Sequence, residues 1–160
     1  MMSVGRVSVL LLAITIAAPI VGIAQEAPPK QKTLYERLGR YDMIAKIVDT
    51  FLPKLGSDPR VASMISGLAA TSRNRNRQFI VDQLCEATGG PCVYIGRTMV
   101  AAHQGLGITQ DLWELSQKKM GETLDELKIK DPERSELIAV IEKLRPDIVQ
   151  KPAEETKKQE

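Results

Sequence analysis

The chain has 160 residues and a nearly balanced charge, with 22 lysine and arginine residues against 20 aspartate and glutamate residues. This balance gives no bulk electrostatic attraction to nucleic acid, so the sequence does not predict a nucleic-acid-binding protein. The chain is long enough for one hydrophobic core and little more, so we expect a single domain.

Residues 1–24 are predicted to be a signal peptide. Arg6 precedes an apolar run of about 17 residues, which ends in Gly22-Ile23-Ala24, a small-x-small sequence that suits signal peptidase. The alternative is an uncleaved N-terminal anchor, although the run is short for a membrane span and Pro19 interrupts it. In either case we expect an exported protein, periplasmic or secreted, that contacts the membrane only if this segment is retained.

The rest of the chain divides into a linker, one domain and a tail. Residues 25–32 are polar and contain proline, as a linker does, and residues 150–160 form a charged tail that we expect to be disordered. Residues 33–149 show helical periodicity, with no convincing strand alternation or hairpin turn. The predicted class is therefore all-α.

The first helices are marked by clear start and stop signals. Thr33-Leu-Tyr-Glu36 matches a capping box, and the short helix that it begins is expected to stop at Gly39. Apolar residues at helical spacing predict an amphipathic helix over 41–55. Asp58-Pro59 places proline at the first position of another short helix.

Similar signals predict the later helices. Thr71 or Ser72 is expected to cap a longer helix, which ends near Ala87 before Gly89-Gly90-Pro91. The others expected are a short helix over about 96–104 that Gly105 and Gly107 end, a helix capped by Thr109, and a last helix opened by Asp131-Pro132.

The two cysteines, Cys85 and Cys92, flank a chain reversal in the sequence CEATGGPC. In an exported protein an even number of cysteines favours a disulfide. Two unpaired thiols are the alternative. The spacing matches neither a thioredoxin-like redox motif nor a covalent haem attachment motif.

His103 is the one histidine of the chain. It follows Met99 by four residues, so the two share a helix face, and its small neighbours Ala101 and Ala102 would let a flat group approach. A histidine that only fills the core and a histidine that ligates a metal both fit this pattern. No nucleophile elbow, phosphate loop or dinucleotide fingerprint is present, so we assign no catalytic residue.

Four stretches together resemble the group I truncated haemoglobins, whose helices pack two over two around haem. They are LYERLG (34–39), DTFLPKLGSDPRV (49–61), QLCEATGGPCVYIGRTMVAAHQGLGIT (83–109) and LRPDIV (144–149). The third is the most specific, because GG, Y-x-G-R and M-x-x-x-H keep the spacing of the family. The resemblance implies a truncated globin domain over 33–149.

The resemblance also implies a cofactor and a set of residues that hold it. His103 would be the axial ligand to the iron of haem b. Tyr94 and one of the arginines in 73–77 would lie near the haem propionates. The remaining expected pocket residues are Phe51, Leu52, Ile65, Asn76, Phe79, Ile80, Leu84, Met99, Val100, Trp113 and Met120.

Several positions depart from the family pattern on the side of the haem away from His103. Leu52 replaces a tyrosine that usually donates to bound oxygen, Ile80 replaces a frequent glutamine, and Ile65 stands where globins place a phenylalanine. Asn76 is then the only evident donor. Because a lost hydrogen bond costs about 1–3 kcal/mol here, we expect fast oxygen release and easy oxidation. Carbon monoxide and nitric oxide should bind comparatively well.

The resemblance therefore implies a haem protein that reversibly binds a diatomic gas and is served by an unidentified reductase. One alternative is a haem enzyme acting in nitric oxide detoxification or peroxidase-like chemistry, for which no distal acid or base is evident. Another is a haem-free globin-fold module for interaction or redox sensing, acting through Cys85 and Cys92.

Overall fold

The computed structural model describes residues 31–150, which form helices and no strand. The expected signal peptide, most of the linker and nearly all of the tail lie outside the described residues. Eight helices occur in the described range: α1 (Leu34–Leu38), α2 (Arg40–Gly56), α3 (Pro59–Ile65), α4 (Ala70–Ala87), α5 (Met99–His103), α6 (Gln110–Glu126), α7 (Glu133–Glu142) and α8 (Arg145–Ile148). Within 31–150, no helix has both the length and the apolar character needed to cross a membrane.

The predicted capping box begins helix α1. Thr33 Oγ1 accepts from the Glu36 backbone N–H at 3.2 Å, and Glu36 Oε2 accepts from the Thr33 backbone N–H at 2.9 Å. Gly39 ends the helix with φ +109, a left-handed conformation that favours glycine, so the chain turns directly into α2. The helices predicted at 41–55 and at Pro59 are confirmed as α2 and α3.

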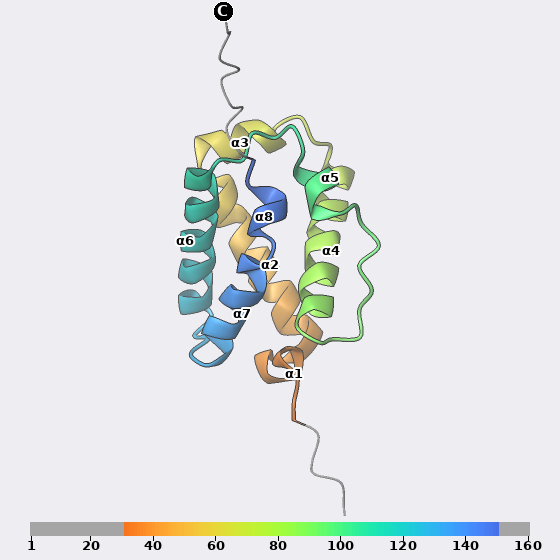
Figure 1. The fold of residues 1–160 in the computed structure, drawn as a ribbon, viewed down its shortest axis with the longest axis vertical. Coiled ribbons are helices and arrows are strands. Elements are labelled where there is room, and N and C mark those ends of the chain that lie inside the picture. The colour runs from red at the N-terminus through yellow and green to blue at the C-terminus, as the bar shows by residue number, and fades with distance from the viewer. Residues whose placement is uncertain (1–30, 151–160) are drawn as a thin grey trace, which may run out of the picture. The chain divides into compact units, whose positions relative to one another are not determined.

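Helix α2 is the centre of the core. It packs against both α4 and α6, and Figure 1 shows it running behind them, with α6 on one side and α4 on the other. Its residues Ile44, Ile47 and Val48 are fully buried. They form one cluster with Leu34, Leu38, Val81, Leu84, Cys85, Met120, Leu124 and Leu137. The domain thus depends on one aliphatic core with almost no aromatic side chains.

Two helix pairs build the sandwich, α2 with α4 and α6 with α7. Helix α5 packs on α8, whereas α4 and α5 do not pack closely against each other. Figure 1 shows α5 beside the start of α4, with the loop over 89–98 extending outward between them. The predicted all-α class is confirmed, and the separation of α4 from α5 leaves the site described below.

Three predicted helix boundaries are wrong. Helix α4 begins at Ala70, before either predicted cap, and its N-cap residue Ala69 has no side-chain acceptor for the free backbone N–H groups. Helix α5 begins only at Met99, because the backbone over 93–98 is extended or bent. The last predicted helix is divided into α7 and α8 around Leu144, two residues before Pro146, which has no N–H to donate.

The predicted disulfide is confirmed between Cys85 and Cys92, whose Cα atoms are 5.8 Å apart. It joins the last turns of α4 to the loop that leads to α5. Gly90 lies inside the reversal, and a Cβ there would come within 2.7 Å of both Cys85 Sγ and Tyr35 Cδ2. Only glycine therefore fits the close packing of this turn against α1.

We expect Gly90→Ala to lower the free energy of unfolding by about 1–3 kcal/mol, because the added methyl group overpacks this turn. Chemical denaturation of the purified protein measures the change. Gly67→Ala is the matched control, because a Cβ there meets nothing within 4 Å. Equal stability of the two variants would show that the turn has room for a side chain.

Candidate functional site

His103 lies at the end of α5 with one ring nitrogen already engaged. Its Nδ1 is 2.8 Å from the Met99 carbonyl oxygen. Because a carbonyl oxygen only accepts, Nδ1 must carry the proton, and the neutral ring then has its lone pair on Nε2. Among the described residues Nε2 makes no hydrogen bond. This is the arrangement in which a metal-ligating histidine is held by a backbone carbonyl.

The backbone of His103 is also held from the C-terminal end of the domain. Gln150 Nε2 donates to the His103 carbonyl oxygen at 3.1 Å, and Gln150 Oε1 accepts from the Gly107 N–H at 3.0 Å. The Gln150 backbone N–H donates to the Ile108 carbonyl oxygen. Gln150, which the sequence placed at the start of the tail, thus fixes the short helix that carries the imidazole.

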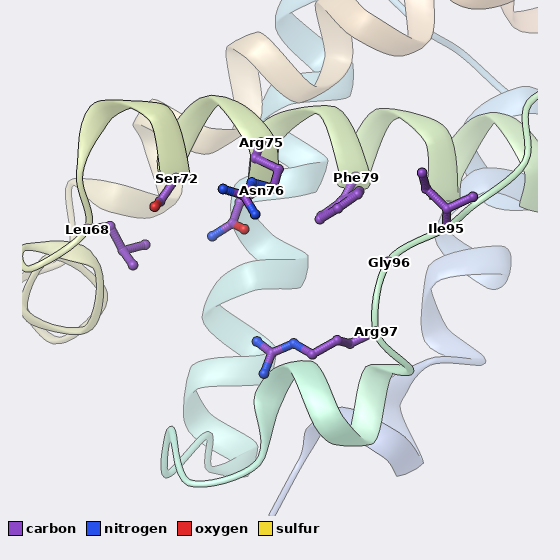
Figure 2. Close-up of a pocket in the computed structure, with 8 residues that line it drawn as sticks. All are labelled: Leu68, Ser72, Arg75, Asn76, Phe79, Ile95, Gly96 and Arg97. Atoms are coloured by element: carbon purple, nitrogen blue, oxygen red, sulfur yellow. The ribbon is translucent and has the colours of Figure 1, made fainter.

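A cavity of about 550 Å³ opens between α4 and the loop before α5. Figure 2 shows the α4 side chains pointing into it from one side and Arg97 entering from the loop, with α5 across from α4. The lining is half apolar and half polar: Leu68, Ser72, Arg75, Asn76, Phe79, Ile95, Gly96 and Arg97. His103 is not part of this lining, but it lies on α5, the helix across from α4.

The motif Y-x-G-R has a local structural explanation. The Tyr94 hydroxyl donates to the Arg97 carbonyl oxygen at 2.6 Å, so the ring folds back over Gly96. A Cβ on Gly96 would lie only 2.4 Å from the Tyr94 hydroxyl oxygen. The Tyr94 ring also meets Phe79 edge to face, with ring centroids 6.1 Å apart. These contacts hold the cavity-lining part of the loop against α4.

Two guanidinium groups face the cavity, those of Arg75 and Arg97. Within residues 31–150, neither is paired with a carboxylate in an ion pair. The neighbouring arginines are engaged elsewhere: Arg73 donates to the Leu68 carbonyl oxygen and Arg77 pairs with Asp49 at 2.7 Å. Of the arginines in 73–77, Arg75 is therefore the one available to an anionic ligand.

The structure brings some of the expected pocket residues to the cavity and places the others in the core or on the surface of the domain. Asn76 and Phe79 line it, and Tyr94 shapes its loop. Leu84 and Met120 are buried in the core cluster, against which Phe51, Leu52 and Ile80 pack. Trp113 is buried and donates from Nε1 to Glu142 at 3.0 Å. Ile65 and Val100 are exposed, at 38% and 52%, and Met99 is half-buried.

Sequence reasoning missed several residues of the site. Leu68, Ser72 and Ile95 line the cavity, and Ile95 is 78% exposed. Gln83 and Gln117 have buried amide atoms without a partner. For Ser72 a signal was present, because 72, 76 and 79 share a helix face, whereas no pattern marks a buried glutamine.

The fold and this site agree with what is found for one protein family. The model of the bacterial-like globin family matches residues 33–150, most of the chain, and the chain therefore belongs to this family. The relatives of this chain belong to one group of truncated haemoglobins. The group 1 truncated haemoglobin of Tetrahymena pyriformis is 30% identical over 122 residues, 76% of this chain and 98% of the relative. That of Mycolicibacterium paratuberculosis is 28% identical over 116 residues, 72% of this chain and 83% of the relative.

Solved structures agree with this assignment. Truncated haemoglobin from Tetrahymena pyriformis in its Fe(III) form aligns with a TM-score of 0.68 and 29% identity, over 75% of this chain and all of that one. The 2/2 haemoglobin from Synechococcus sp. PCC 7002, in the cyanomet state with covalently attached haem, aligns with a TM-score of 0.66 and 26% identity, over the same shares. The resemblance to group I truncated haemoglobins and the two-over-two fold are confirmed.

Burial raises the pKa of the Tyr94 phenol, while the nearby Arg97 cation acts in the opposite direction. A raised pKa in the folded state gives stability that is complete below the unfolded value of about 10 and is lost as pH rises through the folded pKa. We expect Tyr94→Phe to lower the free energy of unfolding by about 0.5–1.5 kcal/mol below pH ~10, with the difference from wild type shrinking above it. Denaturant titrations of both proteins across this pH range measure the difference in their free energies of unfolding. A difference that grows as the pH rises above about 10 would show that the Tyr94 phenol does not have a raised pKa in the folded state.

Proposed function

We propose that this protein binds haem b through Nε2 of His103 and uses it to bind a diatomic gas reversibly. The observation that carries the proposal is the 2.8 Å contact between His103 Nδ1 and the Met99 carbonyl oxygen. Donation from Nδ1 to the Met99 carbonyl oxygen leaves Nε2 as the only ring atom with a free lone pair. When bound there, haem would supply the iron at which oxygen, carbon monoxide or nitric oxide binds.

The residues of the cavity fit this cofactor. Phe79, Leu68 and Ile95 offer apolar surface to a flat macrocycle, and the exposed face of Ile95 would be covered by it. Arg75 and Arg97 could each bind a carboxylate group of the ligand, because neither has a carboxylate partner among the described residues. A guanidinium pairs well with a carboxylate, so we assign the haem propionates to these two arginines.

The chain's own residues also define the side on which a gas would bind. Leu52 and Ile80 pack against the aliphatic core and carry no polar group, so neither would donate a hydrogen bond to the gas. Asn76 lines the outer part of the cavity and is exposed to water. Asn76 is thus the side chain of this lining that could donate to a small neutral gas through an uncharged amide. An unidentified reductase would be needed to keep the iron ferrous.

We also propose that the protein is exported. The Cys85–Cys92 disulfide supports this, because stable disulfides are typical of oxidising compartments. The apolar run after Arg6 is the corresponding targeting signal in the sequence. The protein would then act in the periplasm or outside the cell, and at the membrane only if the leader is retained.

We expect purified protein reconstituted with haem to show a Soret band, and His103→Gly to lose haem affinity. Removal of a group that only orients a metal ligand lowers affinity by roughly 10–100-fold. Removal of the ligand itself should lower haem affinity by more than that. Added imidazole should restore the ferrous five-coordinate spectrum, because it refills the space of the missing ring. Titration of haem into the apoprotein, followed by absorption, measures both effects.

Gln104→Ala is the matched control for this experiment, because Gln104 is the exposed neighbour of His103 at the helix end. It should bind haem as the wild type does. Absence of a Soret band in the wild type would refute the proposed function. An unchanged ferrous spectrum in His103→Gly without imidazole would show that another residue holds the iron.

A further inference from the structure

The loop over 91–97 is joined to the rest of the domain by few contacts. Within the described part of the chain, none of its backbone groups forms a hydrogen bond with another backbone group. Its specific links to α4 are the Cys85–Cys92 disulfide, the edge-to-face contact of the Tyr94 ring, and a 3.4 Å hydrogen bond from the Tyr94 backbone N–H to Glu86. The disulfide is the one covalent link among them, so the position of the loop depends strongly on it.

The turn that precedes this loop is fixed without the disulfide. The Gly90 backbone N–H donates to the Cys85 carbonyl oxygen at 2.8 Å. The Thr88 carbonyl oxygen accepts from the Tyr35 backbone N–H at 2.9 Å, which ties the turn to α1. Opening the disulfide therefore frees the chain only from Pro91 onward.

The other end of the loop is fixed as well. Thr98 is the N-cap of α5, and its Oγ1 accepts from the Ala101 backbone N–H at 3.3 Å. Its carbonyl oxygen accepts from the Ala102 backbone N–H at 2.8 Å. Because the His103 carbonyl oxygen is held separately by Gln150, opening the disulfide leaves the imidazole in place.

The loop supplies one side of the cavity. Ile95, Gly96 and Arg97 line it, and Figure 2 shows the Arg97 side chain reaching into it. Arg75 faces the same cavity from α4, where the hydrogen bonds of a helix hold its backbone. The two guanidinium groups that we assign to the haem propionates are thus held in different ways, one by a helix and one by a loop that depends on the disulfide.

The two sulfur atoms differ in exposure, which determines how a reductant attacks. Cys85 is fully buried in the core cluster, whereas Cys92 is half-buried. A thiolate of a dithiol reductant therefore attacks Cys92 Sγ and forms a new S–S bond there, while Cys85 leaves with the electron pair and takes a proton. The second thiol of the reductant then displaces Cys92, which is also protonated.

This exchange is balanced, because two electrons and two protons pass from the dithiol to the protein and the reductant becomes a disulfide. It also leaves the core intact. A cysteine thiol behaves as a small hydrophobic side chain, so Cys85 can stay among its aliphatic neighbours after reduction.

We propose that the Cys85–Cys92 disulfide is a redox switch for haem retention. In the oxidised protein it keeps Ile95 and Arg97 at the cavity. Reduction by a dithiol releases the loop over 91–97, so haem loses a cation for one propionate and part of its apolar cover. This inference rests on the proposed haem-binding function. Because His103 does not move, haem dissociates faster while its iron keeps the same protein ligand.

The first test uses the haem-free protein, in which the loop is followed by trypsin cleavage after Arg97. We expect this cleavage to be faster after reduction with dithiothreitol, and equally fast without reductant in Cys92→Ser, which cannot form the disulfide. Cleavage after Arg75 on α4 is the internal control and should not change. An unchanged rate at Arg97 would show that other contacts hold the loop, and faster cleavage at both sites would show that reduction unfolds the domain. Either result would overturn the inference.

The second test measures transfer of haem from the loaded protein to an excess of a haem-scavenging apoprotein. We expect transfer to be about tenfold faster after reduction, the order expected for loss of a hydrogen bond to a charged group. Cys92→Ser should show the fast rate without a dithiol, which separates the effect from any action of the reductant on iron. The ferrous five-coordinate spectrum should be the same in all of these proteins.

Two arginine variants test whether the disulfide acts through the loop. In Arg97→Ala the haem contact of the loop is already lost, so reduction should accelerate transfer by much less than in the wild type. Arg75→Ala is the matched control, in which reduction should still have its full effect. Equal rates for oxidised and reduced wild type, or full acceleration in Arg97→Ala, would overturn the inference. Failure of the oxidised wild type to take up haem would instead refute the proposed function, and the trypsin result would be unaffected.

Discussion

The hydrogen bond from His103 Nδ1 to the Met99 carbonyl oxygen is the interaction on which the site depends. It selects one tautomer of the only histidine in the chain and so decides which nitrogen can bind a metal. A helix of five residues has little stability of its own. Helix α5 is held in place by packing on α8 and by the Gln150 side chain, which bonds to the His103 carbonyl oxygen.

The loop that faces α4 across the cavity depends on a different set of constraints. The Cys85–Cys92 disulfide ties the loop to the end of α4, and Gly90 permits the close turn that the disulfide closes. Further along, Tyr94 folds over Gly96 and bonds to the Arg97 carbonyl oxygen. These local contacts present the Arg97 side chain to the cavity without any regular secondary structure over 93–98. The site is therefore formed by a rigid helix, α4, facing an irregular loop fixed by short-range bonds.

Much of the fold could be predicted from the sequence because its signals are local. The capping box at Thr33, the stop at Gly39 and the periodicity of α2 each depend on residues within a few positions of one another. The start of α4 was mispredicted because Thr71 and Ser72 are good caps, yet the chain is already helical at Ala70. Such a boundary is decided by the packing of the preceding loop, which the local sequence does not record.

The site was predictable only in part, for the same physical reason. Spacing and resemblance identified His103, Asn76 and Phe79, whose helix positions determine the direction of their side chains. Arg73, Arg75 and Arg77 could not be told apart in sequence, because their roles depend on the Leu68 carbonyl, the cavity and Asp49. The enclosure of the Gln117 amide likewise depends on what surrounds α6, which no local pattern in the sequence records.

The central claim is that the single imidazole of this chain holds the iron through Nε2. Resonance Raman spectroscopy of the haem-loaded ferrous protein tests it most directly, with histidine labelled by heavy nitrogen. Because the chain contains one histidine, the label marks His103 alone. The account predicts an iron–nitrogen stretching band that shifts to lower frequency on labelling. A five-coordinate ferrous spectrum without any label-sensitive band would contradict it.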